Sequence, residues 1–257
     1  MSGAPHLWLA ARRDEARLAL MLLTRLPMGR IATPPTLAAA VWAYPLAGVA
    51  VGALIGGVFS GALWLGVPGS AASVLGLVAG VVTTGGMHED GLADLADGFG
   101  GGQTRTRKLE IMRDSRVGSY GVIALVLALS LRLTLLAGMA GGWRTVAALV
   151  GLAATSRAVL PVLMLTLPQA RAEGLGAKAS AQVSRGAVLA ALGIGCAFAL
   201  IGVPGAIEVI VTMALAGAAM AGLAVRQIGG VTGDVLGATQ VMCELAGWIA
   251  LTAYLAH

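Results

Sequence analysis

The stretch AAAVWAYPLAGVAVGALIGGVFSGALWLG, residues 38–66, decides the fold, because it runs without a single charged side chain. An α-helix needs about 20 consecutive apolar residues to cross the hydrocarbon core of a bilayer. The stretch is long enough for one crossing. It therefore predicts a transmembrane helix and sets the question for the rest of the chain.

The composition of the whole chain agrees with this prediction. Hydrophobic residues make up 58% of the 257 residues, charged residues 11%, and the mean hydropathy is +0.87. Since soluble domains are about one quarter charged, simple disorder, a coiled coil and an ordinary soluble enzyme are excluded. The 38 glycines suit closely packed transmembrane helices. The net charge of +5 is typical of basic cytoplasmic loops, and we expect no nucleic-acid partner.

Further apolar runs divide the chain into spans. The seven predicted spans are 38–66, 70–87, 117–140, 145–167, 186–203, 205–224 and 237–256. A charged patch interrupts a further apolar stretch, residues 7–26, which predicts a retained amphipathic helix at the interface, with a short extra span as the alternative. We therefore predict an all-α polytopic integral membrane helix bundle. It has about seven transmembrane helices plus an N-terminal amphipathic helix, in a single domain over 1–257.

Basic residues indicate the orientation of this bundle. Fourteen Lys and Arg residues fall in the N-terminal segment and in the loops after the second, fourth and sixth spans, against Arg144 alone on the opposite side. The positive-inside rule predicts that the basic loops are cytoplasmic. With seven spans, all four basic segments fall on the same side of the membrane.

Small residues and cysteines carry narrower predictions. Gly48, Gly52 and Gly56 form a GxxxG ladder, which predicts close helix packing within one bundle and not a dedicated dimer interface. Cys196 and Cys243 lie in apolar stretches without a CxxC or His-rich tract. Neither a disulfide framework nor a zinc site is predicted.

Acidic residues are rare, and half of the twelve lie within 89–114. In GGMHEDGLADLADG, residues 85–98, Asp90, Asp94 and Asp97 are spaced i, i+4, i+7 and share one face of a helix. Close carboxylates raise one another's pKa unless a cation lies between them, and oxygen ligands suit Mg²⁺ or Mn²⁺. The spacing favours a metal site over a solvated helix face at the membrane edge. His88, just before this face, is a candidate base or further ligand.

The segment RKLEIMRDSRVGSYG, residues 107–121, places arginines close to this acidic motif. The guanidinium groups of Arg113 and Arg116 match phosphate or pyrophosphate oxygens, and Asp114 lies between them. The alternative is a basic anchor at the start of the third span.

The segment RQIGGVTGDVLGA, residues 226–238, interrupts two apolar runs. Backbone N–H groups near Gly229, Gly230 and Gly233 are candidates for binding an anion, and Asp234 is a candidate metal or hydroxyl ligand. A plain turn between helices explains the glycines equally well. The segment is not a Walker A loop.

Arg157 lies within a predicted span, where a cation is costly and indicates function by default. We take it as a candidate substrate-binding residue. Arg132 and Glu244 raise the same question.

The sequence resembles the cobalamin synthase family, also called adenosylcobinamide-GDP ribazoletransferase or cobalamin 5′-phosphate synthase. The resemblance runs nearly end to end. Its motifs are TRLP (24–27), YPLAG (44–48), GGMHEDGLADLADG (85–98), EIMRDSRVG (110–118), SR (156–157), EGLG (173–176) and GGVTGDVLGA (229–238).

The resemblance implies a Mg²⁺-dependent enzyme of the bacterial cytoplasmic (inner) membrane, with its active site on the cytoplasmic face. Such an enzyme joins adenosylcobinamide-GDP to α-ribazole or its 5′-phosphate and releases GMP. The implied metal ligands are Asp90, Asp94 and Asp97, with Asp114 and Asp234 as further ligands. Arg113 and Arg116 would contact the phosphates or the GMP leaving group, and the Gly229–Gly233 loop would approach a nucleotide phosphate. Arg157 would bind substrate, and His88 or an aspartate would take the proton of the attacking hydroxyl.

Two other readings stay open. A CDP-alcohol-type lipid synthase would use the same metal chemistry, although the D-G-x-x-A-R pattern of that family is absent. A transporter would use Arg132, Arg157 and Glu244 as its pathway. The expected partners are small-molecule substrates and the lipid bilayer, while a homo-oligomer and contacts with other cobalamin-pathway enzymes are left open.

Overall fold

The computed structural model describes residues 5–171 and 182–256, without the side chains of residues 5–7. Its helices are α1 (Pro5–Leu23), η1 (Leu37–Ala43), α2 (Tyr44–Trp64), α3 (Gly69–Thr84), α4 (Met87–Gly101), α5 (Arg105–Ile111), α6 (Ser119–Ala137), α7 (Gly142–Thr166), α9 (Arg185–Gly202), α10 (Ala206–Ile228) and α11 (Gly233–Leu255). The described residues form no β-strand, only an isolated bridge between Gln169 and Val231. The predicted all-α bundle is confirmed. The motif at 173–176 lies outside the described residues.

Six helices are long and apolar enough to cross a membrane, and the bent pair α3–α4 makes a seventh span if it is counted as one. The six are η1 with α2, α6, α7, α9, α10 and α11. The prediction of about seven spans is therefore confirmed, with one difference in the second span. It was predicted over 70–87, whereas α3 ends at Thr84 and the chain turns by 88° into α4.

Two consecutive glycines cause this bend. Gly85 and Gly86 have φ of +70° and +71°, in the left-handed region where a side chain is strained. The apolar run continues past them, so the sequence pattern extended the span too far. Because α4 carries several carboxylates, we take α3 as the spanning part of the bent pair and α4 as its continuation at the polar end of the bundle, outside the spanning segments.

The long helix α7 forms the centre of the bundle, and α2 lies along it. A Cβ atom at Gly48, Gly52 or Gly56 would stand 2.1, 2.5 or 2.8 Å from backbone atoms of α7. The GxxxG ladder thus brings two helix backbones together inside one bundle, as predicted.

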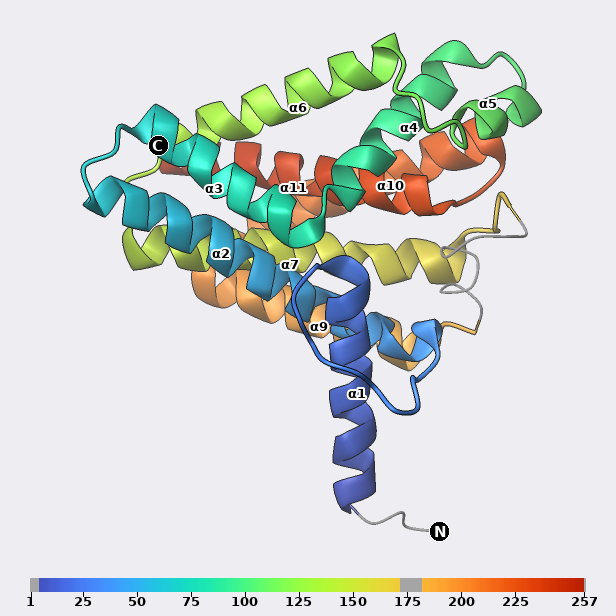
Figure 1. Cartoon of the computed structure of the whole chain (residues 1–257), viewed down its shortest axis with the longest axis horizontal. Coiled ribbons are helices and arrows are strands. Elements are labelled where there is room, and N and C mark those ends of the chain that lie inside the picture. The colour runs from blue at the N-terminus through green and yellow to red at the C-terminus, as the bar shows by residue number, and fades with distance from the viewer. Residues whose placement is uncertain (1–4, 172–181, 257) are drawn as a thin grey trace.

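Figure 1 shows the helices α2, α3, α6, α7 and α9–α11 running along the length of the molecule. The helix α5, the α10–α11 turn and the end of α7 lie at one end, and the α2–α3 turn and the C-terminus lie at the other. The basic segment around α5, the end of α7 and the α10–α11 turn therefore share one end, whereas the basic helix α1 lies against the side of the bundle (Figure 1). The helix α1, which is not among the six spans, crosses the others at a steep angle. A hydrogen bond of 2.6 Å from Trp42 Nε1 to Glu15 Oε2 ties α1 to η1.

Candidate functional site

The acidic face of α4 is graded in exposure along the helix. Asp90 is exposed, Asp94 is half-buried and Asp97 is buried. All three project from one face, because they are spaced i, i+4, i+7. The face therefore runs from solvent at its N-terminal end into the protein at its C-terminal end.

The start of α11 adds a fourth carboxylate to this face. A Cβ atom at Gly91 would stand 2.9 Å from the backbone oxygen of Asp234, and one at Gly237 would stand 3.4 Å from the Cα atoms of His88 and Gly91. The approach at Gly91 leaves no room for a side chain, whereas a Cβ atom at Gly237 would be in ordinary contact. The sequence motifs around Asp90 and Asp234, far apart in the chain, thus meet in one place.

The electrostatics of the group show an excess of negative charge. Partial burial, together with the like charges of Asp90, Asp234 and Asp97, raises the pKa of the Asp94 carboxyl to about 7, while the nearby Arg171 acts in the opposite direction. A carboxyl group with a pKa this high is poorly compensated by its surroundings. A bound cation would supply the missing compensation.

These carboxylates fit a metal that the substrate helps to bind. In the described ranges, no three His, Cys, Asp or Glu side chains form a ready-made metal centre. Mg²⁺ commonly takes only one or two protein carboxylates and completes its shell with water and substrate phosphates. Asp90, Asp94 and Asp234 have the oxygen chemistry for such a site. Their assignment as Mg²⁺ ligands stays a prediction.

Arg171 is part of this site, although the sequence pattern assigned it no role. Its Nη1 lies 3.3 Å from Asp234 Oδ2, and its Nη2 donates to the backbone oxygen of Leu109 at 3.0 Å. Its guanidinium also lies within electrostatic reach of Asp94 and Arg113. The residue follows α7 without a recognisable motif, so only the fold reveals its position.

The predicted glycine loop is held by the segment that leads to Arg171. Val231 N–H donates to the oxygen of Pro168 at 2.8 Å, and Ala170 N–H donates to the oxygen of Val231 at 3.0 Å. A Cβ atom at Gly230 would stand 2.1 Å from the Pro168 oxygen. The close approach at Gly230 thus serves a neighbouring backbone segment. Gly229 ends α10 with φ of +75°, and a Cβ atom at Gly233 would meet open space.

The arginine segment forms an exposed loop after α5. Arg116 Nη2 lies 2.6 Å from Asp114 Oδ2, and this hydrogen-bonded pair holds the pKa of the Asp114 carboxyl at about 2. Asp114 is not among the charges that raise the pKa of Asp94. The structure therefore brings Asp90, Asp94 and Asp234 together but keeps Asp114 with Arg116.

His88 lies on the other side of α4 from the carboxylates. It precedes Asp90 by two residues, about 200° around the helix, and it is only 2% exposed. Its ring shares a small internal cavity with Glu89, Arg132, Arg157 and Glu244. This geometry does not favour His88 as a base or ligand beside the aspartates.

Arg157 is equally enclosed. Its Nη1 lies 3.6 Å from Glu244 Oε2 and donates to the backbone oxygen of Ala153 at 3.0 Å. With 2% exposure, it contacts protein groups within the bundle. The structure therefore assigns its charge to an internal ion cluster, and its predicted substrate contact gains no support from this position.

A cavity of about 560 Å³ opens beside the acidic face and is lined by Arg25, Gly85, Gly86, Glu89 and Asp90 among others. The Arg25 side chain lies across Gly85, where a Cβ atom would stand 2.5 Å from Arg25 Nε. The TRLP motif at 24–27 thus reaches the site through Arg25, a residue to which the sequence alone assigns no role.

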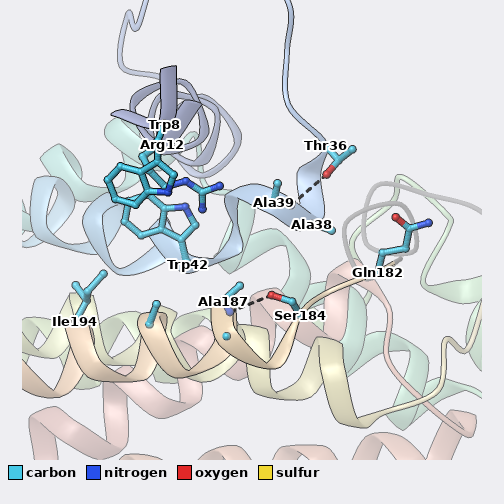
Figure 2. A pocket seen from close by; sticks show the side chains of 12 residues that line it. Trp8, Arg12, Thr36, Ala38, Ala39, Trp42, Gln182, Ser184, Ala187 and Ile194 are labelled. Carbon is cyan, nitrogen blue, oxygen red and sulfur yellow. Dashed lines mark hydrogen bonds between the residues drawn. The ribbon is translucent and has the colours of Figure 1, made fainter. Parts of the chain in front are cut away.

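Figure 2 shows a third cavity, of about 720 Å³, between α1, η1 and α9. Trp8, Trp42, Ala187 and Ile194 are among its lining residues. None of the candidate carboxylates or arginines of the acidic face lines it. This cavity is therefore separate from the 560 Å³ cavity that borders the acidic face.

The fold and this site define a polytopic helical membrane protein that carries carboxylates and arginines at one end of its bundle. The chain belongs to the family described as cobalamin-5-phosphate synthase, which matches residues 15–252.

Curated relatives carry the name adenosylcobinamide-GDP ribazoletransferase. The protein from Mesorhizobium japonicum is 44% identical over 245 residues, covering 94% of this chain and 95% of the relative. The protein from Bradyrhizobium diazoefficiens is 42% identical over 250 residues, covering 93% and 94%. No solved structure matches the chain.

Proposed function

We propose that this chain is a Mg²⁺-dependent transferase that joins adenosylcobinamide-GDP to α-ribazole or α-ribazole 5′-phosphate and releases GMP. The names of the relatives give the substrate class. The observation that supports this chemistry is the excess negative charge of three carboxylates, Asp90, Asp94 and Asp234. Arg171 lies at the edge of this group and pairs with Asp234. A pyrophosphate substrate bound through a divalent cation needs this combination of charges.

Each group then has a role at a defined place. Asp90, Asp94 and Asp234 would hold Mg²⁺, which would neutralise charge on the pyrophosphate. Arg171 and Arg113 offer guanidinium groups to the phosphate oxygens. Arg25 lines the adjacent cavity, where it is placed to orient the substrate.

The proton of the attacking hydroxyl goes to a carboxylate of the acidic face in this proposal. The ribazole hydroxyl oxygen forms a new bond to the phosphorus that carries cobinamide, and the bond from that phosphorus to the oxygen of GMP breaks. The acceptor is a carboxylate of this face that does not bind the cation directly, because a bound cation would lower the pKa of the Asp94 carboxyl from the value of about 7 that it has without metal. His88 is the less favoured acceptor because it lies inside the bundle.

Turnover by the purified protein tests the proposal. We expect GMP and the cobalamin product from adenosylcobinamide-GDP, α-ribazole 5′-phosphate and Mg²⁺, and neither without Mg²⁺. Turnover of CDP-diacylglycerol with an alcohol, in place of the cobinamide substrate, would favour the CDP-alcohol alternative and overturn the proposal. Flux of a substrate without turnover would favour the transporter.

A chirally labelled phosphate tests whether the transfer is direct. The sequence has no serine or cysteine elbow that suggests a covalent intermediate, so we expect one in-line displacement and inversion at phosphorus. Net retention would indicate two displacements through a phosphorylated residue and would exclude direct attack.

The bacterial cytoplasmic membrane, with the acidic face toward the cytoplasm, is the proposed location. Ser70, in the first turn of α3, and Thr104, just before α5, are both exposed, and the α2–α3 turn and α5 lie at opposite ends of the bundle (Figure 1). In a background without Cys196 and Cys243, a membrane-impermeant thiol reagent should label Ser70→Cys in intact cells and leave Thr104→Cys unlabelled. The reverse pattern would overturn this orientation.

A further inference from the structure

Asp97 differs from the other carboxylates of α4 because both of its oxygens already have partners. Gly118 N–H donates to Asp97 Oδ2 at 2.6 Å, and Gly121 N–H donates to Asp97 Oδ1 at 2.8 Å. The side chain is 7% exposed. Asp90 and Asp94 have no such hydrogen bonds to described residues.

These two donors belong to the start of α6. Gly118 is the residue just before the helix, and Gly121 lies in its first turn. The first N–H groups of a helix have no partner within it, and they form the positive end of the helix dipole. The Asp97 carboxylate satisfies two of them from another helix. Gly118 itself has no side chain that could do so.

Both glycines are required by this contact. A Cβ atom at Gly118 would stand 2.5 Å from Asp97 Oδ1, and one at Gly121 would stand 2.4 Å from Asp97 Oδ2. No side chain larger than hydrogen leaves room for the carboxylate at these distances. The glycines of the VGSYG sequence thus serve the approach of Asp97.

The loop between α5 and α6 is attached to α4 at its other end as well. The buried side chain of Met112 packs against Gly98, where a Cβ atom would stand 2.4 Å from Met112 Cγ. The segment 113–117, which carries Arg113, is therefore held at both ends by α4: Met112 before it contacts Gly98, and Gly118 after it donates to Asp97.

We propose that Asp97 is a positioning residue that caps α6 and holds the arginine segment beside the acidic face, and that it is not a metal ligand. The cap follows from the contacts alone. Its consequence for turnover rests on the proposed function, since it is Arg113 that the segment would bring to the phosphates. Asp97 thus has a different role from Asp90 and Asp94, although all three share the i, i+4, i+7 spacing.

Amide hydrogen exchange on the metal-free protein tests the cap without any assay of activity. Asp97→Asn loses one acceptor and turns an amide N–H toward a backbone N–H. We expect exchange of the segment 113–121 to become on the order of tenfold faster, the change that follows from losing a helix cap. Asp94→Asn, the matched control on the same face, should leave this exchange unchanged.

Gly121→Ala tests the same junction without removing a carboxylate. Its methyl group would displace Asp97, so faster exchange of the segment 113–121 is expected here too. If Asp97→Asn does not yield folded protein, Gly121→Ala in the full chain still tests the cap. Wild-type exchange rates in a folded Asp97→Asn or Gly121→Ala variant would overturn the cap.

The Mg²⁺ requirement separates positioning from metal binding. Asp97→Asn and Gly121→Ala should raise the KM for adenosylcobinamide-GDP. At saturating adenosylcobinamide-GDP they should leave the Mg²⁺ concentration for half-maximal activity unchanged, while Asp94→Asn should raise that concentration. An equal increase for Asp97→Asn, without an increase for Gly121→Ala, would make Asp97 a ligand and overturn the proposal. If the wild-type protein does not turn over this substrate, the proposed function fails, and the exchange experiment still decides the cap.

Discussion

Two groups of charged residues lie on opposite sides of α4, and they differ in charge balance. Toward the inside of the bundle, Glu89 belongs to a cluster with Arg132, Arg157 and Glu244. On the acidic face, Asp90 and Asp94 meet Asp234 and Arg171. The first cluster has two positive and two negative side chains, whereas the second has three carboxylates and one guanidinium.

The balanced cluster links four helices inside the bundle. Arg132 of α6 donates to Glu89 of α4 at 2.8 Å and lies 3.6 Å from Glu244 of α11. Arg157 of α7 lies 3.6 Å from the other oxygen of Glu244, which also accepts a hydrogen bond from Gln240. A charge within a membrane protein is costly unless it is paired. Here the two positive and two negative side chains balance one another, so we infer that the cluster stabilises the packing of these helices.

The acidic face lacks this balance, and this difference tells the two groups apart. Both groups consist of ionisable residues, which are rare in this chain and for that reason indicate function when only the sequence is known. Only the group with excess negative charge at an accessible position needs a cation. The comparison predicts that the inner cluster (Glu89, Arg132, Arg157 and Glu244) is needed for folding. The outer group (Asp90, Asp94, Asp234 and Arg171) is needed for turnover.

The largest effect is expected from Glu244→Ala. The substitution leaves Arg132 and Arg157 buried without their shared anion, and breaking a buried ion pair costs about 3–5 kcal/mol. We expect little folded protein, measured by size-exclusion chromatography and thermal unfolding in detergent. Glu208→Ala, at an exposed position in the first turn of α10, is the matched control and should unfold like the wild type.

A charge-balanced double variant sharpens this test. Arg157→Met combined with Glu244→Gln removes one charge of each sign and leaves Arg132 paired with Glu89. It should recover part of the folded protein that Glu244→Ala loses. If Glu244→Ala unfolds like the wild type, the cluster does not brace the bundle and the comparison fails on its inner side.

The second effect concerns turnover by Asp94→Asn. Losing one well-placed charge group typically costs on the order of 100-fold or more in rate. Asp94 is half-buried at the polar end of the bundle, so the variant should still fold. GMP release gives the rate, and the thermal unfolding curve gives the folding control. Near-normal turnover in folded Asp94→Asn and Asp90→Asn would make the acidic face a solvated helix surface.

The third effect is a smaller one and concerns pH. Since the folded-state pKa of Asp94 is raised to about 7, the metal-free folded protein binds this proton more tightly than the unfolded chain. Stability from this group is therefore highest at low pH and falls as the pH rises from about 4 to 7. A bound cation removes the penalty, so Mg²⁺ should raise the melting temperature more at pH 8 than at pH 6.

The Asp94→Asn variant is the control for this pH dependence. It cannot ionise at this position, so the difference between the Mg²⁺ effects at the two pH values should shrink. An equal Mg²⁺ effect at pH 6 and pH 8 in the wild-type protein would contradict the role of Asp94. Thermal unfolding without substrate measures all of these values.

The spans and the acidic face could be predicted because both are local patterns. Apolar runs are continuous in sequence, and a spacing of i, i+4, i+7 fixes a helix face without knowledge of the fold. The bend at Gly85 and Gly86 could not be read in this way. Glycine is common throughout the chain, and only the backbone angles distinguish these two.

The composition of the site depends on contacts between distant segments. Arg171 and Asp234 meet across more than sixty positions of sequence, and Arg25 reaches the cavity from the first loop. The spacing also grouped Asp97 with two carboxylates that it does not resemble, because spacing reports the direction of a side chain and not its partners. His88 shows the same limit, since it lies two residues before Asp90 in sequence while its side chain lies in the internal cavity on the opposite side of the helix.

The smallest effect is expected from Asp114→Asn in the exposed pair with Arg116. Exposed ion pairs contribute little to stability, so the melting temperature should not change measurably. The folded-state pKa of Asp114 is lowered to about 2, so its contribution is present above pH 4 and is lost only as the pH falls toward 2. Between pH 6 and pH 8 the variant should therefore follow the wild type.

Turnover by Asp114→Asn tests whether Asp114 belongs to the group of carboxylates that binds the cation. The contacts keep this carboxylate with Arg116 and away from Asp94, so the Mg²⁺ requirement should change far less than in Asp94→Asn. An equal increase would mean that the loop carries Asp114 to the cation during the reaction. The outer group would then include a fourth ligand from the arginine segment, and the cap formed by Asp97 would have to permit that movement.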